Sequence, residues 1–157
     1  MPLPRKVSQV EWAHECEAPA FARKARLRGT KALGLAYERK LARALPREAI
    51  HGQWFYYRGD SRVGFCQPDF LLKGRSELAV LEAKLTDVEA AREQLEQLYA
   101  PVLRACYGKR VLGIVVVKSL TRLTSDVEVC EDLLAAISCA RRGRSLPVLH
   151  WIGTGRL

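Results

Sequence analysis

The sequence predicts an α/β fold with a mixed central β-sheet flanked by helices. Segments with helical periodicity alternate with segments rich in strand-forming residues, in a chain of 157 residues that fits one domain. The nearly continuous aliphatic run 111–117 is typical of a strand buried on both faces. The predicted order of elements is helix, three strands, helix, strand, helix and strand, with a helical crossover leading to the aliphatic strand.

The N-terminal part of the chain is expected to form a basic segment, residues 1–29, ahead of the main domain, residues 30–157. Residues 8–11 resemble a capping box and predict a short helix. Residues 21–28 form a basic amphipathic stretch, which suits either a helix or an arm that becomes ordered on nucleic acid.

The first helix of the main domain is expected over residues 30–45. Leu33, Tyr37 and Leu41 fall on one face at helical spacing. Pro46 ends this helix, because the residue before a proline disfavours the α conformation.

Three strands follow the first helix. Residues 53–57 are rich in aromatic strand formers, and residues 59–61 form a turn signal. Residues 63–72 predict the second strand, residues 73–76 turn the chain, and residues 78–83 predict the third strand.

A second helix is expected after the third strand. Thr86 and Glu89 form a capping box, and the helix runs to about Tyr99, with Pro101 kinking or stopping it. The remaining predicted elements are a buried strand over residues 111–117, a helix over residues 126–142 and a strand over residues 146–151.

The charge distribution favours a polyanionic partner. The net charge is +9, and residues 1–47 hold 11 basic and 4 acidic residues. Each phosphate contact releases condensed counterions, so nucleic acid is the expected ligand, with a ribosomal or membrane-surface role as alternatives. The residues expected to contact DNA phosphates are Arg23, Lys24, Arg26, Arg28, Lys31, Arg141, Arg142 and Arg144.

Acidic and basic side chains gather where the second and third predicted strands meet. Asp69 follows Pro68 on the second strand, and Glu82 and Lys84 end the third. The turn at Gly74 makes a hairpin that brings Asp69 beside Glu82, and alternation along the strand puts Glu82 and Lys84 on one face. Two converging carboxylates repel one another, and a divalent cation such as Mg²⁺ relieves that repulsion and also bridges to phosphate. A simple surface salt bridge from Glu82 to Lys84 is the alternative.

The segments Cys66-Gln67-Pro68-Asp69-Phe70 and Val80-Leu81-Glu82-Ala83-Lys84 resemble the signature of the PD-(D/E)XK, or restriction-endonuclease-like, nuclease superfamily. The αβββαβ core of that family is similar to the order predicted above, over about 90 of the 157 residues. The resemblance implies Asp69 and Glu82 as metal ligands, the backbone carbonyl of Ala83 as a further ligand, and Lys84 as the catalytic lysine.

Two further positions match that family. Many members carry a glutamate on the first helix near the metal, and Glu38 matches it, which adds Glu38 to the implied metal ligands and catalytic residues. A solvated helix glutamate paired with a basic neighbour is the alternative for Glu38. Gln94 matches a glutamine of resolvase-like and RecB-like members and lies about 80° from the centre of its helix's apolar stripe. In RecB-like members a tyrosine follows that glutamine by four residues, whereas Tyr99 follows Gln94 by five.

The resemblance implies a Mg²⁺- or Mn²⁺-dependent deoxyribonuclease, an endonuclease that hydrolyses DNA phosphodiester bonds. Branched or junction DNA suits a small basic enzyme of this kind, and similar junction resolvases act as homodimers. A phage or mobile-element nuclease is equally open, and RNA is not excluded as a substrate. The alternatives are a nucleic-acid-binding protein that keeps the fold without cutting, and a structural partner in a larger complex.

Other residues suggest less specific roles. The five cysteines show no CxxC spacing, so free thiols are expected. His51 and His150 are expected to be structural, and the aromatic residues Trp54, Tyr56 and Tyr57 suit a core more than base stacking. No apolar run is long enough to span a membrane, so we expect a cytoplasmic protein, nucleoid-associated or in a host cytoplasm if phage-encoded.

Overall fold

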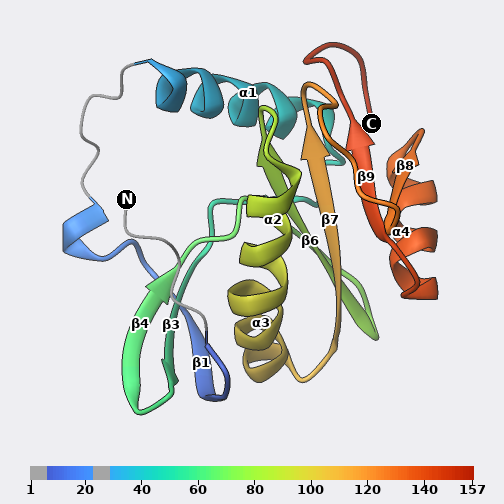
Figure 1. Cartoon of the computed structure of the whole chain (residues 1–157). Helices are drawn as coiled ribbons and strands as arrows, with labels where there is room; N and C mark the ends of the chain where they lie inside the picture. The colour runs from blue at the N-terminus through green and yellow to red at the C-terminus, as the bar shows by residue number, and fades with distance from the viewer. Residues whose placement is uncertain (1–6, 23–28) are drawn as a thin grey trace.

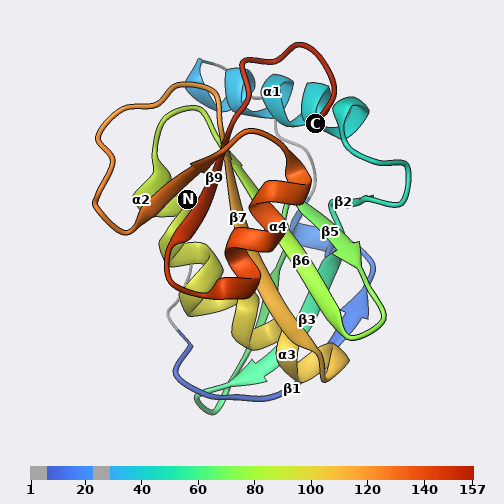
Figure 2. The same cartoon turned by 90° about the vertical axis from the view of Figure 1, so that its right-hand side faces the viewer.

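The computed structural model describes residues 7–22 and 29–157 and contains two β-sheets with helices packed against them (Figures 1 and 2). The larger sheet has the strand order β2-β5-β6-β7-β9-β8, and the smaller sheet has the order β1-β3-β4. The strands of the larger sheet are β2 (Ile50–His51), β5 (Phe70–Lys73), β6 (Glu77–Lys84), β7 (Arg110–Val117), β8 (Val127–Cys130) and β9 (Leu146–His150). The strands of the smaller sheet are β1 (Val10–Cys16), β3 (Trp54–Gly59) and β4 (Arg62–Cys66).

Helices cover both faces of the larger sheet. One face carries a continuous helical column, and the other carries α1 and α4, as the two views in Figures 1 and 2 show. The column consists of α2 (Val88–Gln94), a π turn η2 (Leu95–Tyr99) and α3 (Ala100–Tyr107). The other helices are α1 (Thr30–Ala44), α4 (Leu133–Arg142) and the 3₁₀ turn η1 (Ala20–Ala22). None of the helices in the described part of the chain is both long and apolar enough to cross a membrane.

The larger sheet is mixed, and its central strands are buried on both faces. Strands β5 and β6 pair antiparallel, whereas β7 runs parallel to both β6 and β9. Along β7, Val115 and Val117 pack against the helical column, and Ile114 and Val116 pack against α1 and α4. This alternation explains the continuous aliphatic run, and it confirms the predicted α/β fold with a mixed sheet flanked by helices.

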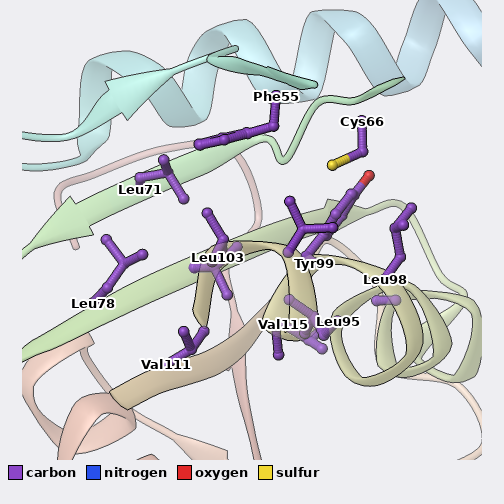
Figure 3. Close-up of a cluster of buried hydrophobic side chains, with 14 of the residues drawn as sticks. Phe55, Cys66, Leu71, Leu78, Leu95, Leu98, Tyr99, Leu103, Val111 and Val115 are labelled. Atoms are coloured by element: carbon purple, nitrogen blue, oxygen red, sulfur yellow. The ribbon is translucent and has the colours of Figure 1, made fainter. Parts of the chain in front are cut away.

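The smaller sheet packs on the same face of the larger sheet as the helical column. Figure 3 shows Phe55 and Cys66 of the smaller sheet above Leu71 and Leu78 of the larger one, with Leu103 of α3 beside the lower pair. All five side chains are buried, and Phe55 and Leu71 are fully inaccessible to solvent. The two sheets therefore share one hydrophobic core with the helical column.

Several predicted elements are confirmed. The helix over residues 30–45 corresponds to α1, and the strands over residues 53–57, 78–83, 111–117 and 146–151 correspond to β3, β6, β7 and β9. The turn at residues 59–61 is also present, with positive φ angles of 51° at Asp60 and 61° at Ser61.

The prediction of a single second strand over residues 63–72 is wrong. The chain forms β4 in the smaller sheet, leaves it after Cys66, and enters the larger sheet as β5. Pro68 stands at this crossing, where a residue without a backbone N–H cannot continue a ladder. The predicted three-strand meander is therefore divided between two sheets, and β5 pairs with the short strand β2 on its other edge.

Two predicted helices also differ from the structure. Residues 8–11 do not open a helix, because the Ser8 backbone N–H and hydroxyl both donate to the Asp60 carboxylate and hold this segment beside the β3–β4 turn, ahead of strand β1. The predicted helix 126–142 begins later, since residues 127–130 form strand β8. Asp132 caps α4 by accepting a hydrogen bond of 2.8 Å from the Ala135 N–H.

The helical column is longer than predicted. Its N-cap is Asp87 rather than Thr86, and the Asp87 carboxylate accepts a 2.9 Å hydrogen bond from the Ala90 N–H. Pro101 does not end the column, because it lies in the first turn of α3, where a missing N–H is tolerated. The column ends at Gly108, which adopts a left-handed conformation with φ of 63°.

Candidate metal centre

Strand pairing brings Asp69 and Glu82 together. In the β5–β6 ladder Phe70 stands opposite Leu81, and Leu71 stands opposite Val80. Continuing this register by one pair places Asp69 opposite Glu82, and directly opposed residues in an antiparallel ladder project from the same face. The hairpin prediction for these two carboxylates is confirmed by the register.

The next pair of the ladder explains why a proline precedes Asp69. The same register puts Pro68 opposite Ala83, at a position where an ordinary residue would exchange two backbone hydrogen bonds with its partner. Pro68 has no N–H to donate to the Ala83 carbonyl. The Ala83 N–H donates instead to Oδ2 of Asp69, at 2.8 Å, which fixes the orientation of that carboxylate.

Glu82 is a buried acid with one oxygen unsatisfied. The residue is only 3% exposed. Its Oε1 lies 3.3 Å from Nζ of Lys84, two residues further along the same strand. Its Oε2 is buried and has no hydrogen-bond partner in the described part of the chain. A buried carboxylate oxygen without a partner is costly, so this oxygen requires a ligand or a proton.

The electrostatics of the pair are unfavourable without a cation. Burial, followed by the negative charges of Glu82 and Glu38, raises the pKa of Asp69 well above its usual value. Burial also raises the pKa of Glu82, and Lys84 counteracts only part of this increase. Two adjacent acids in a desolvated site bind a proton or a cation more readily than exposed acids do.

Glu38 on α1 lies within electrostatic range of this pair, since its charge contributes to the raised pKa of both Asp69 and Glu82. Its Oε1 lies 2.7 Å from Nε2 of His51, and the His51 ring stacks on Phe70 at 4.6 Å. Glu38 therefore pairs with a basic side chain, that of His51, and remains partly exposed. Among the described residues it does not join Asp69 and Glu82 in a group of three that could hold a metal ion. His51 was expected to be structural, but its contact with Glu38 was not predicted, because the two-residue strand β2 gives no periodic signal.

A π turn joins Gln94 to Tyr99. Five residues span about 1.4 turns of a regular α-helix, which would point the two side chains apart. The wider π turn brings them together, and Nε2 of Gln94 donates to the Tyr99 hydroxyl at 3.4 Å. That hydroxyl donates in turn to the carbonyl of Gln67, also at 3.4 Å.

Tyr99 lies within electrostatic range of the acid pair, and Gln94 is linked to the pair through its hydrogen bond to Tyr99. The pKa of Tyr99 is raised by burial and then by the charges of Glu82 and Asp69. Oε1 of Gln94 is buried and has no hydrogen-bond partner among the described residues. Sequence reasoning assigned no role to Tyr99, because the spacing of five hides its proximity to Gln94.

The donor set fits a hard divalent cation. Two carboxylates converge, one carboxylate oxygen lacks a partner, and the Ala83 carbonyl has no N–H opposite it. Within residues 7–22 and 29–157 no group of three or more His, Cys, Asp or Glu side chains has a metal-holding arrangement. Mg²⁺ matches this smaller set, because it takes one or two carboxylates and completes its octahedron with waters and phosphate oxygens.

The predicted phosphate-binding residues are spread over the molecule. Arg23, Lys24, Arg26 and Arg28 lie outside the described residues, and Lys31 is exposed on α1. Arg141 forms an ion pair with Glu77, and Arg142 forms one with Glu128 at 2.9 Å, with both arginine side chains more than half exposed. Arg144 borders a surface depression of about 460 Å³ beside α3 and β9, which none of the acid-pair residues line.

All five cysteines are free thiols, and none of them contributes to the acid pair.

No family model, curated protein or solved structure matches this chain.

Proposed function

We propose that this protein is a metal-dependent endonuclease that hydrolyses DNA phosphodiester bonds, with a restriction-endonuclease-like core. The observation that carries this proposal is the buried pair of Asp69 and Glu82 beside Lys84, at the adjoining ends of β5 and β6. Buried acids with raised pKa and an unsatisfied oxygen are unfavourable for the fold alone, and such groups concentrate at functional sites.

The residues divide into two roles. Asp69, Glu82 and the Ala83 carbonyl would hold Mg²⁺ or Mn²⁺, and Glu38 adds negative charge to the site. The cation would supply Lewis-acid stabilisation of the charge that develops on the phosphoryl group. Lys84, whose ammonium lies beside Glu82, would donate a hydrogen bond to the attacking water or to the phosphoryl oxygens.

Gln94 would position the attacking water. Its buried Oε1 lacks a partner and accepts hydrogen bonds only, so a water molecule that donates to it is held in a defined orientation. Tyr99 fixes the amide by accepting from its Nε2, which leaves Oε1 as the end that faces a ligand. The helical column thus supplies positioning, and the β5–β6 hairpin supplies the cation site.

A cleavage assay on supercoiled plasmid tests the activity. Wild-type protein should nick and linearise plasmid with Mg²⁺ or Mn²⁺, and EDTA should abolish cutting. Asp69→Asn should reduce cutting at least about 100-fold, as expected when a cation ligand is lost. Glu131→Gln is the matched control, because Glu131 is exposed in the loop before α4. Metal-independent binding without any cleavage by the wild type would instead support a non-catalytic nucleic-acid-binding protein.

The substrate class is tested by a panel of single-stranded, duplex, nicked and four-way DNA. Branched or junction DNA is the favoured substrate. The net charge of +9 favours contacts with phosphates, and such contacts respond to the shape of the backbone and not to base sequence. Equal cutting of linear duplex and four-way DNA would favour a nuclease of the phage or mobile-element kind. Size measurement of the DNA complex tests whether a homodimer forms.

A further inference from the structure

One face of the smaller sheet carries aromatic side chains that the core does not use. Strand pairing places His14, Tyr56 and Phe65 opposite one another on β1, β3 and β4. Because side chains alternate between faces, Phe55 and Tyr57 point the other way and are buried. We call the outward set, together with a residue of η1, the aromatic face; its members are Trp12, His14, Phe21, Trp54, Tyr56 and Phe65.

The rings of the aromatic face contact one another in sequence. Trp12 stacks on His14 with ring centroids 5.4 Å apart and planes at 25°, and it lies 5.1 Å from Tyr56. Tyr56 lies 5.0 Å from Phe65, and Phe65 meets the ring of Phe21 at 5.5 Å. A row of rings therefore extends across all three strands of the smaller sheet and onto η1.

Two rings of the aromatic face, those of Phe21 and Phe65, remain exposed to solvent. Phe21 is 70% exposed and Phe65 is 38% exposed, so the described residues leave much of both rings in water. Cross-strand aromatic pairs do stabilise a sheet, but Phe55 and Tyr57 already bury the inner face of β3. Contiguous exposed apolar surface on a soluble domain is typical of a binding site.

We propose that the aromatic face binds single-stranded nucleic acid by stacking unpaired bases on its rings. Every base has a π-face, and aromatic side chains on a sheet surface bind single strands with little sequence preference. The charge of the protein complements this ligand, because the chain carries +9 overall. Arg58 lies on the same face of β3 as Tyr56, opposite Trp12 and Val63, and its side chain is 43% exposed beside Glu11. In the sequence, a basic run begins at Arg23, two positions after Phe21.

This binding does not require the acid pair, since no member of the aromatic face contributes to the metal centre. The inference therefore goes beyond the proposed cleavage reaction and stands or fails separately from it. It places an unpaired strand, rather than duplex DNA alone, among the ligands of this protein.

Fluorescence anisotropy of a labelled oligothymidine in EDTA tests the proposal, because EDTA separates binding from cleavage. Phe21→Leu and Phe65→Leu keep an apolar side chain but remove the ring, and each should weaken binding about fivefold or more. Phe65→Trp keeps a ring and should retain the wild-type affinity. Val63→Ala is the matched control, because Val63 lies exposed on the same strand and face as Phe65.

A second readout uses the tryptophans of the face. Bound oligothymidine should quench the fluorescence of Trp12 and Trp54, and the quenching should be lost in Phe65→Leu in parallel with affinity. Unchanged affinity in both leucine variants would overturn the proposal, as would self-association that the leucine variants abolish without changing affinity for the oligonucleotide. If Phe65→Leu lowers the unfolding midpoint, the affinities of Phe21→Leu and Phe65→Trp for the oligonucleotide still decide whether the rings bind it.

Discussion

Replacing Glu82 by glutamine should stabilise the metal-free protein at alkaline pH. Burial raises the pKa of Glu82 from 4.5 to about 7, despite the opposing effect of Lys84. An acid with a higher pKa in the folded state than in the unfolded chain stabilises the fold only while it is protonated. This contribution is therefore complete below the unfolded pKa of 4.5 and is lost as the pH rises through about 7.

The expected magnitude follows from the change in proton affinity. Each tenfold change corresponds to about 1.4 kcal/mol, so ionised Glu82 costs the folded state about 3 kcal/mol at about pH 8. Urea unfolding in EDTA should show Glu82→Gln more stable than wild type by an amount of this order. At about pH 5 the difference should be much smaller, because wild-type Glu82 is then largely protonated.

Addition of Mg²⁺ tests whether the buried Glu82 carboxylate belongs to a cation site or is only an unfavourably buried charge. The cation should raise the unfolding free energy of wild type at about pH 8 and leave that of Glu82→Gln nearly unchanged. Asp69 responds to the same substitution, because the Glu82 charge helps to raise its pKa, so the pH dependence reports the pair of acids together. Asp126 and Glu15 do not contribute to it, because hydrogen bonds from Arg92 and Lys73 lower their pKa values. Equal stability of wild type and Glu82→Gln in EDTA at both pH values would refute the reasoning.

Three further predictions concern the same machinery. Lys84→Met should slow single-turnover cleavage by about 100-fold or more while keeping the Mg²⁺-dependent gain in stability, and loss of that gain would make Lys84 part of the cation site. Deleting Glu96 from the π turn should change the unfolding free energy by only about 1 kcal/mol, because the column relaxes to a regular helix. Deleting Glu93 from α2 should lower the unfolding free energy much more, since the deletion rotates one part of the helix by about 100° relative to the other. Urea unfolding followed by circular dichroism compares the stabilities of the two deletion variants. Neutralising the basic residues of 23–28 should weaken DNA binding for all sequences and reduce its salt dependence, and unchanged affinity would remove this segment from the interface.

The sequence predicts the β5–β6 hairpin that carries the acid pair, because the relevant signals are local. A short turn fixes the register between β5 and β6, so spacing alone places Asp69 opposite Glu82. Alternation along one strand then sets Lys84 beside Glu82. The aliphatic run of β7 is equally informative, because only a strand buried on both faces is apolar at every position.

The second sheet could not be predicted from local patterns. Residues 53–57 and 63–66 read as strands of the main sheet, and periodicity does not say which partner a strand will choose. The choice depends on β1, whose pairing with β3 is a contact between residues about forty positions apart. The residues before β1 have the sequence pattern of a helix start. They do not form one, because Ser8 donates its hydrogen bonds to Asp60, which is distant in sequence.

The surroundings of the acid pair were only partly predictable for a similar reason. Glu38 was identified from its place on α1, but its partner His51 lies on a two-residue strand. Neither partner alone predicts the other, because their proximity depends on how α1 crosses the end of the larger sheet (Figure 2).

The π turn of the helical column has a consequence for comparing distant proteins. An extra residue within a helix ordinarily rotates everything beyond it, yet here the insertion is contained within a single widened turn. Gln94 and Tyr99 face each other although five positions separate them. A sequence comparison that assumes regular helical spacing would therefore place these two side chains on different sides of a helix.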